Sequence, residues 1–426
     1  MVENVITLNL QWIKCLQPIY VQLKECIKIL NKIKCNFKND RSFTMFIMVG
    51  IFAGIAGGIY NTVFNNFLNA TYHLTESQRG FLELPREFPG VCIAIVLGLL
   101  AFLGDTRLSA IGMFLASIGL VGMGYLSPSY VTLILFLMVY SLGTHMYMPL
   151  SSSIGMSLSD SKSLGRRLGL YSAYGLFATL FGYTFVWVGF KFCHLSYKGA
   201  FVSAAFFYLI ASFFAHQIKT NNKKPSGTRF VFKKKYSLYY VLCLLYGARK
   251  QVFLTFAPWV LISIFHLDAP TFAILGVIVS VLSIGTRTIV GNAIDKLGER
   301  FVLCSEAILL IIICCGYAFS QKIFSASVAV IIMCACYILD NSLSVVEMAR
   351  STYVKKICDT PDDVTPTLST GTSLDHIFAM TIPTLGGLLW KVTGTYQSVF
   401  IAAAIIAMIN LVLSLNIRLP KHMQQI

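Results

Sequence analysis

Twelve apolar segments, each close to the length that crosses a bilayer, limit what this chain can fold into more than any other feature. A membrane-spanning helix needs about 20 mostly apolar residues, and lipid offers the backbone no hydrogen-bond partners, so such segments span as helices. The chain has 426 residues, of which 56% are hydrophobic and 12% charged, too few polar residues to cover a soluble protein. The predicted spans are residues 44–69, 80–103, 108–125, 131–154, 168–190, 199–216, 238–265, 271–291, 302–319, 323–346, 369–390 and 399–415. The sequence therefore predicts an all-α integral membrane protein with twelve transmembrane helices.

The distribution of basic residues predicts the topology. The formal net charge of +16 would suit nucleic acid, but most of the 34 Lys and Arg residues fall in alternate connections, which is the positive-inside pattern. The connections on the opposite side carry Arg79, Lys191, Lys198, Lys322 and Lys391. We therefore expect no nucleic-acid partner, both termini in the cytoplasm, and a place in a bacterial cytoplasmic (inner, plasma) membrane.

A basic polar stretch separates six predicted spans from six more. We predict a cytoplasmic basic amphipathic segment at 1–43, an N-terminal six-helix half at 44–216, a basic cytoplasmic linker at 217–236, a C-terminal six-helix half at 237–416 and a cytoplasmic tail at 417–426. Two pseudo-symmetric halves are typical of secondary transporters. In the first segment Leu23 and Ile27 share one helical face and Lys24 and Lys28 another, which favours a helix lying on anionic lipids; a partly ordered tail is the alternative.

The twelve cysteines show no ligand framework, and most lie in apolar spans, where we interpret them as packing residues. Cys334 and Cys336 offer a weak alternative as ligands of a soft metal. No nucleophile and base stand at a recognisable spacing. We therefore expect neither a metal nor a cofactor, and no enzymatic activity.

A polar motif stands between the eighth and ninth predicted spans and predicts a tight turn; it reads Gly291-Asn292-Ala293-Ile294-Asp295-Lys296-Leu297-Gly298-Glu299-Arg300-Phe301. Here the chain resembles the major facilitator superfamily, whose loop between spans two and three, with a copy between eight and nine, reads G-x-x-x-D-R/K-x-G-x-R/K. The first-half copy, Gly104-Asp105-Thr106-Arg107, lacks the second glycine. The resemblance implies alternating access around a central site lined by spans one, four, seven and ten. It also implies a conformational latch made of Asp105, Arg107, Gly291, Asp295, Lys296, Gly298 and Arg300.

Two adjacent cations in predicted span seven are the first candidates for a site. Arg249 and Lys250 each cost about 3 kcal/mol at bilayer depth, so such residues face a protein interior or a watery cavity. Tyr246 shares a face with each of them. Adjacent helical residues point about 100° apart, so we expect one cation to bind solute and the other to pair with an acid. Internal pairing of both is the alternative.

Acidic partners lie in spans two, ten and eleven. Glu83, Arg86 and Glu87 share a stripe at the start of span two, which predicts an outer gate, a titrating carboxylate or an interfacial ion pair. Asp340 in span ten and Asp375 with His376 in span eleven predict a proton relay; bracing of a neighbouring helix is the alternative for Asp375. Full internal pairing is possible, because the deep cations Arg86, Arg249, Lys250 and Arg287 equal in number the deep acids Glu83, Glu87, Asp340 and Asp375.

Neutral polar residues complete the candidate site. Asparagines in span one and a histidine in span four suit hydroxyl, carboxylate or amide groups; hydrogen bonding between helices is the alternative. The solute-binding candidates are Arg249, Lys250, Asn61, Asn65, His145, Tyr246 and Asn341. The proton-coupling or ion-pair candidates are Asp340, Asp375, His376, Glu83, Arg86 and Glu87.

These patterns favour a monomeric, proton-coupled secondary active transporter of a small organic solute, anionic or zwitterionic, that works by alternating access. The first alternative is a multidrug or metabolite efflux antiporter, although span five lacks the proline motif that the resemblance leads us to expect of proton-coupled exporters. The second is a non-transporting membrane receptor or scaffold that uses the basic N-terminal segment.

Overall fold

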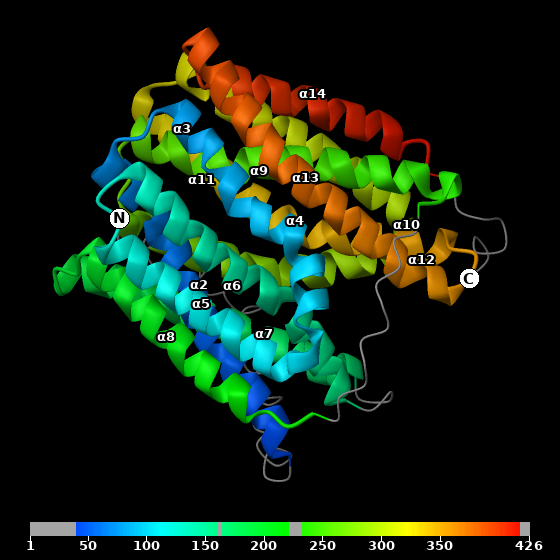
Figure 1. Cartoon of the computed structure of the whole chain (residues 1–426). Coiled ribbons are helices and arrows are strands. Elements are labelled where there is room, and N and C mark those ends of the chain that lie inside the picture. The colour runs from blue at the N-terminus through cyan, green and yellow to red at the C-terminus, as the bar shows by residue number, and fades with distance from the viewer. Residues whose placement is uncertain (1–39, 160–163, 221–231, 418–426) are drawn as a thin grey trace, which may run out of the picture.

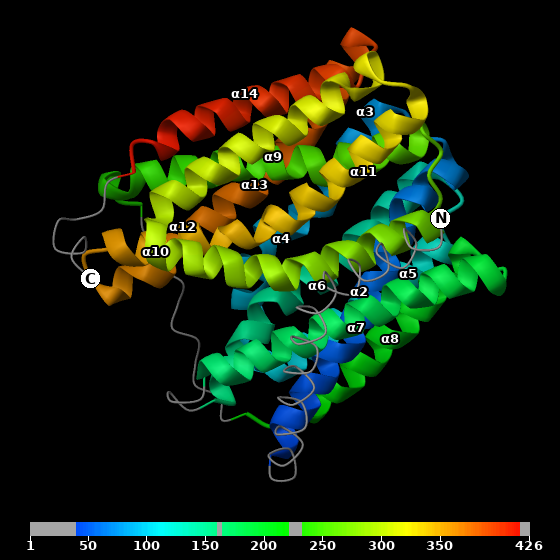
Figure 2. The ribbon, with the colours of Figure 1, turned by 180° about the vertical axis from the view of Figure 1, so that it is seen from behind.

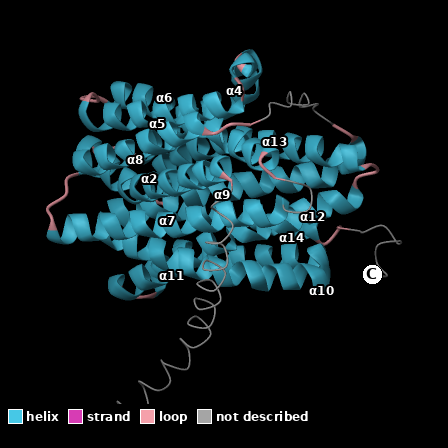
Figure 3. Ribbon diagram, turned by 90° about the horizontal axis from the view of Figure 1, so that it is seen from below, coloured by secondary structure: helices cyan, strands magenta, loops and turns pink. Residues whose placement is uncertain are grey.

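The structure is a computed structural model that describes residues 40–159, 164–220 and 232–417. Every regular element in these residues is a helix, as Figure 3 shows. The helices are α2 (Arg41–Tyr72), α3 (Glu76–Phe81), α4 (Glu83–Leu99), η2 (Ala101–Leu103), α5 (Asp105–Tyr125), α6 (Tyr130–Ser157), α7 (Leu164–Phe192), α8 (Tyr197–Gln217), η3 (Lys234–Tyr236), α9 (Ser237–Ser263), α10 (Ala269–Ile323), α11 (Ala326–Leu343), η4 (Ser344–Val346), α12 (Glu347–Ile357), α13 (Pro361–Thr393) and α14 (Gln397–Ser414). The predicted all-α fold is confirmed.

The helices form two groups (Figure 1). In the amino-terminal group, α2 to α8, helix α2 packs against α7 and α8, and α5 packs against α6 and α8. In the carboxyl-terminal group, α9 to α14, helix α10 packs against α11 and α14, and α9 packs against α13 and α14. Between the groups, α13 contacts α3 and α4, and α10 contacts α7. The two predicted halves therefore meet mainly through these three helix pairs.

Each of the twelve predicted spans lies on helices of the described chain. Eight helices are long and apolar enough to cross a membrane by length and composition alone. One of these, α10, contains both the eighth and the ninth predicted spans. Its two arms, visible in Figure 2, meet at Gly298, where φ is +80° and ψ is 166°.

The sequence motif led us to expect a tight turn over residues 291–301, and the structure corrects its position. The first arm of α10 stays helical through Leu297, and the break is confined to Gly298. Glycine adopts a positive φ without the clash that a Cβ would create. A single residue therefore makes the change of direction that the prediction assigned to a turn of eleven residues.

The second predicted span is also divided. Helix α3 starts at a capping box, in which the Thr75 hydroxyl accepts from the Gln78 amide and the Gln78 side chain accepts from the Thr75 amide. Leu82 separates α3 from α4, which contains Pro89. Glu83 is consequently the first residue of α4, where the unpaired amides of a helix start favour a negative charge.

Three helix ends share one local design that the sequence analysis missed. Helices α2, α7 and α9 are each followed by a histidine with positive φ, namely His73 (47°), His194 (50°) and His266 (56°). A leucine comes next in every case, and then the residue that caps the following helix: Thr75, Ser196 or Asp268. The repeated His-Leu-cap sequence thus lies in connections of three to five residues between one helix and the next.

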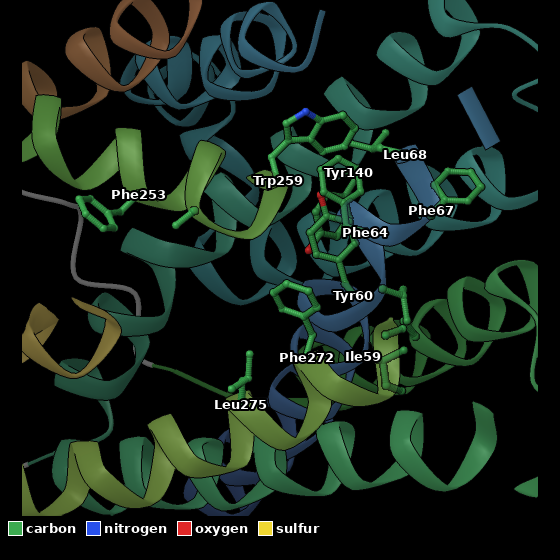
Figure 4. Packing of buried hydrophobic residues seen from close by; sticks show 14 of the residues in the cluster. Ile59, Tyr60, Phe64, Phe67, Leu68, Tyr140, Phe253, Trp259, Phe272 and Leu275 are labelled. Atoms are coloured by element: carbon green, nitrogen blue, oxygen red, sulfur yellow. The ribbon is translucent and has the colours of Figure 1, made fainter. Parts of the chain in front are cut away.

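We call the end of the bundle that carries these turns the predicted external end, and the other the predicted cytoplasmic end. Toward the predicted external end, large apolar side chains pack across the two groups. Figure 4 shows Trp259 of α9 beside Leu68 of α2, and Phe272 of α10 in the same cluster. Trp259 and Leu68 are fully buried. Packing of this density fixes the relative position of the groups here.

Several predicted pieces fall outside the described residues. They are the basic amphipathic segment up to residue 39, residues 221–231 of the linker, and the tail from residue 418. Their predicted roles, including the contact with anionic lipids, stay predictions.

Candidate functional site

Glu83 lies at the centre of a buried charge cluster between the two helix groups. Its Oε1 accepts from Arg79 Nη1 at 2.5 Å, and its Oε2 lies 2.5 Å from Arg86. From the other group, Gln251 Nε2 donates to Glu83 Oε2 at 3.0 Å. Arg79 is 2% exposed and Glu83 1% exposed, so each charge depends on the other for stabilisation. The cluster therefore ties α3, α4 and α9 together.

Arg79 is a correction to the sequence analysis, which placed it in an external connection. The apolar length rule began the second span at residue 80, and the separate helix α3 was not foreseen. In the structure Arg79 is buried and also donates from Nε to Asn65 Oδ1 at 3.0 Å. Asn65, predicted to bind solute, is in this conformation a hydrogen-bond partner of Arg79.

Glu87 lies one turn along α4, next to two histidines. Its Oε1 is 2.9 Å from Arg86, and its Oε2 is 3.1 Å from His376 Nδ1 and 3.6 Å from His145 Nε2. Helices α4 and α6 belong to the amino-terminal group and α13 to the carboxyl-terminal group, so these contacts bridge the groups. Sequence reasoning named all three residues but had no means to bring them together, because they lie up to 289 positions apart.

The two cations of α9 both have acidic partners inside the carboxyl-terminal group. Arg249 Nη1 donates to Asp340 of α11, and both side chains are nearly fully buried. Lys250 Nζ lies 3.2 Å from Asp375 of α13 and is 36% exposed. Tyr246 packs beneath them, with its ring centroid 5.7 Å from the Arg249 guanidinium and 5.5 Å from the Lys250 ammonium. The structure therefore shows the alternative in which both cations are paired internally.

A cavity of about 220 Å³ lies beside the second pair, between α9, α12 and α13. Charged and polar groups line much of it, among them Tyr239, Tyr246, Glu347, Arg350, Thr372 and Asp375. Asp375 Oδ1 and Arg350 Nη2 are buried and have no hydrogen-bond partner among the described residues. Buried polar atoms without partners are costly, and the two residues that carry them, one acidic and one basic, both line the cavity.

The pair Glu306 and Arg350 was missed by the sequence analysis. Arg350 Nη1 donates to Glu306 Oε2 at 2.9 Å, and the Arg350 guanidinium lies 3.6 Å from the centroid of the Tyr246 ring. Both residues are buried. Glu306 was detectable as an acid within the apolar run 302–319, whereas Arg350 had been assigned to a cytoplasmic connection.

The other predicted site residues are placed less centrally. Asn61 is exposed, and Asn341 donates to the Tyr337 carbonyl of its own helix at 2.8 Å. In the predicted latch, Asp105 accepts from the Ser153 hydroxyl, and Arg107, Asp295, Lys296 and Arg300 are exposed. The buried acid of that region is Glu299, which pairs with Lys356 at 2.7 Å. The latch stays a prediction. In this conformation the ion pair of this region is the one between Glu299 and Lys356.

Hydrogen bonds between the groups are found toward the predicted external end. Besides Glu83 with Gln251 and Glu87 with His376, Asn66 Nδ2 donates to the Leu267 carbonyl at 2.8 Å and Ser77 Oγ to the Gly387 carbonyl at 3.3 Å. The ribbons of the groups run apart toward α12 and the start of α7 (Figure 1). The conformation is therefore closed at the predicted external end.

Two exposed ion pairs hold η3 to the start of α13 at the other end. Lys233 lies 2.6 Å from Asp363, and Lys235 contacts Asp359. These ammonium groups hold the pKa values of both carboxyls below their usual range, and Asp363 in turn raises the pKa of Lys233. Exposed pairs of this kind contribute little stability, so their role is local.

Two groups of long apolar helices with buried charge clusters between them define an integral, multi-pass membrane protein. The model of the Major Facilitator Superfamily matches residues 46–359, which is well over half of the sequence. The chain therefore belongs to the Major Facilitator Superfamily. Members of this family move small solutes across lipid bilayers by alternating access and are generally not enzymes.

Solved structures of transporters share this fold. The nucleoside transporter NupG is 12% identical with a TM-score of 0.68, and the match covers 88% of this chain and 97% of NupG. A bacterial homologue of the human lysosomal transporter Spinster, in an inward-facing and occupied conformation, is 16% identical with a TM-score of 0.66, covering 88% and 96%. An auto-inhibited peptide transporter of the POT family is 11% identical with a TM-score of 0.69, covering 89% and 98%. No curated protein matches in sequence. At these identities the likeness defines the fold alone.

Proposed function

We propose that this protein is a secondary active transporter of a small zwitterionic organic solute, and that the solute binds in the cavity between α9, α12 and α13. The observation that carries the proposal is the pair of oppositely charged residues that line that cavity, Asp375 and Arg350, each of which has a polar atom without a hydrogen-bond partner among the described residues. A solute with one cationic and one anionic group would match the charges of these two residues. The structures with this fold include transporters of nucleosides and of peptides, which are likewise small polar solutes.

This proposal revises the role of Arg249. Arg249 is 4% exposed, pairs with Asp340 and does not line the cavity. We assign Arg249 a structural role and give solute contact to Asp375 and Arg350, with Lys250 beside them. Cytoplasmic termini and an inner-membrane location remain part of the proposal, and the distribution of basic residues supports them.

Solute binding can be tested on purified full-length protein by thermal shift, because a ligand of the folded state raises its apparent stability. Amino acids and dipeptides should raise the melting temperature, whereas monoanions and amphipathic cations should not. Asp375→Asn should weaken binding about tenfold or more, equivalent to at least about 1.4 kcal/mol. Asp359→Asn is the matched control, because Asp359 is an exposed acid that does not line the cavity.

Other results of these binding experiments would favour other functions. Stabilisation by amphipathic cations alone would favour the efflux alternative. Ligand binding without flux in reconstituted vesicles would favour a receptor. Equal affinity of Asp375→Asn and wild type for zwitterions would contradict the proposed cavity.

For proton coupling we propose Asp340 as the titrating carboxylate. Arg249 of α9 forms an ion pair with it. Its other electrostatic neighbours, all on α10, are Glu306, Cys314 and Tyr317. The double variant Arg249→Gln with Asp340→Asn keeps a neutral hydrogen-bonding pair. It should retain solute counterflow, which needs no net proton movement, but lose accumulation driven by a pH gradient. Accumulation equal to wild type would assign the coupling elsewhere.

A further inference from the structure

Glu87, His145 and His376 present a second kind of site, whose geometry is that of metal ligands. One carboxylate oxygen and one nitrogen from each ring lie within 4.8 Å of one another. A tetrahedral Zn²⁺ with bonds of about 2.0–2.1 Å needs ligand atoms about 3.3 Å apart. The two measured ligand separations, 3.1 Å and 3.6 Å from Glu87 Oε2, lie on either side of that value. Small ring movements would therefore complete the set.

The hydrogen bonding of His145 fixes which of its nitrogens is free. Nδ1 lies 2.9 Å from the Ser141 backbone carbonyl, which can only accept, and 3.0 Å from the Ser141 hydroxyl, which donates its hydrogen to the Arg86 carbonyl; this arrangement assigns the hydrogen to Nδ1. In the neutral ring Nε2 then presents a lone pair, and it faces the acceptor oxygen Glu87 Oε2 at 3.6 Å. Two acceptors held face to face repel each other unless a cation lies between them. A backbone carbonyl that orients the ring of a metal-binding histidine is a common supporting contact.

The surroundings of Glu87 leave the position between its Oε2 and the two histidine nitrogens open to a cation. Arg86 binds the other oxygen, Oε1, and also contacts Glu83, which it shares with Arg79, so Oε2 of Glu87 has no arginine partner among the described residues. Gly90, on the next turn of α4, leaves room for the rings: a Cβ there would lie 2.7 Å from His145 Nε2 and 3.3 Å from His376 Nδ1. A larger residue would push both nitrogens out of place. The close approach of the backbone is therefore part of the site.

We propose that Glu87, His145 and His376 bind a divalent transition metal, with Zn²⁺ as the best fit to two nitrogens and one oxygen. Two imidazoles and a carboxylate suit Zn²⁺ and leave its fourth position for water. Because α4 and α6 belong to one group and α13 to the other, the bound ion joins the groups. The metal thus stabilises the conformation that is closed at the predicted external end and arrests alternating access. The sequence analysis expected no metal site, since the ligands come from three distant helices.

Binding is tested on the purified full-length chain by calorimetric titration with Zn²⁺ alone, and by the visible absorption of Co²⁺ as a spectroscopic substitute. Wild type should bind one Zn²⁺ per chain at this site. His376→Gln, which retains bulk, should weaken binding by about 100-fold or more. Gly90→Ala should do the same although it removes no ligand. His216→Ala is the matched control, because this exposed histidine at the end of α8 lies outside the cluster.

A second readout reports on the conformation and needs no transport activity. Zn²⁺ should slow amide hydrogen exchange in α3 and in the facing part of α13 in wild type, and should leave exchange unchanged in His376→Gln. Equal Zn²⁺ affinity in wild type and both site variants would overturn the proposal. So would the absence of stoichiometric binding, which would leave a proton between Glu87 and His145. Tight binding without any change in exchange would remove the conformational part.

Discussion

Replacing Glu83 with glutamine is expected to lower the free energy of unfolding by about 3–5 kcal/mol and to abolish transport. Removing one partner of a buried ion pair leaves the other charge without compensation, and the expected loss is of that size. Here two arginines and Gln251 converge on the carboxylate. Arg79 cannot turn to water, because its side chain is 2% exposed. Thermal and denaturant unfolding of the purified protein measure the effect.

The matched control for this variant is Glu76→Gln. Glu76 is an acid in the first turn of α3, close to Glu83 in the chain. Loss of its charge should cost about 0.3–1 kcal/mol through the helix dipole. A Glu83→Gln protein that unfolds like wild type would mean that water or a neighbouring group replaces the carboxylate. In that case the cluster would not be what joins α3, α4 and α9.

Replacing Gly80 with alanine is expected to open the predicted external end and to slow transport more than tenfold. A Cβ on Gly80 would lie 2.2 Å from the Pro383 carbonyl oxygen, which belongs to the backbone of α13 and cannot rotate away. Overpacking costs about 1–3 kcal/mol. Since 1.4 kcal/mol changes a population ratio tenfold, the closed conformation would lose about 5- to 150-fold in population relative to the open one.

Labelling kinetics test this directly. Ser77 lies on the same helix and donates to Gly387 of α13, so a cysteine placed at Ser77 should react faster with a membrane-impermeant thiol reagent when Gly80 is alanine. Gly98→Ala is the control, since a Cβ at Gly98 of α4 meets no atom within 4 Å. Equal labelling rates with glycine and with alanine at position 80 would show that α3 and α13 accommodate the extra methyl group without destabilising the closed conformation.

Much of the fold could be predicted because lipid leaves few choices. Apolar length fixed where the helices lie, and the charge distribution predicted their direction. The boundaries were harder: the length rule merged α3 with α4 and so placed Arg79 outside the membrane. Capping at Thr75, which depends on a side chain two residues past a positive-φ histidine, was the signal that could have separated them.

The site could be predicted only as a set of residues. Intramembrane charges are rare enough that Arg249, Lys250, Asp340 and Asp375 stand out, and the structure pairs them as two ion pairs. Which acid meets which base depends on how helices distant in sequence pack, and a single sequence carries no record of that. The meeting of Glu87, His145 and His376 is the extreme case, because three helices from both groups supply one residue each.

The His-Leu-cap turns make three of the helix connections at the predicted external end short and stiff. A long flexible loop would let two helices tilt independently, whereas a connection of three to five residues, with one in the left-handed region, couples the two helices closely. Helices α2 and α3, α7 and α8, and α9 and α10 are joined in this way. Motion between conformations must therefore be absorbed inside the helices, where Pro89, Pro149 and Pro258 interrupt the backbone hydrogen bonding.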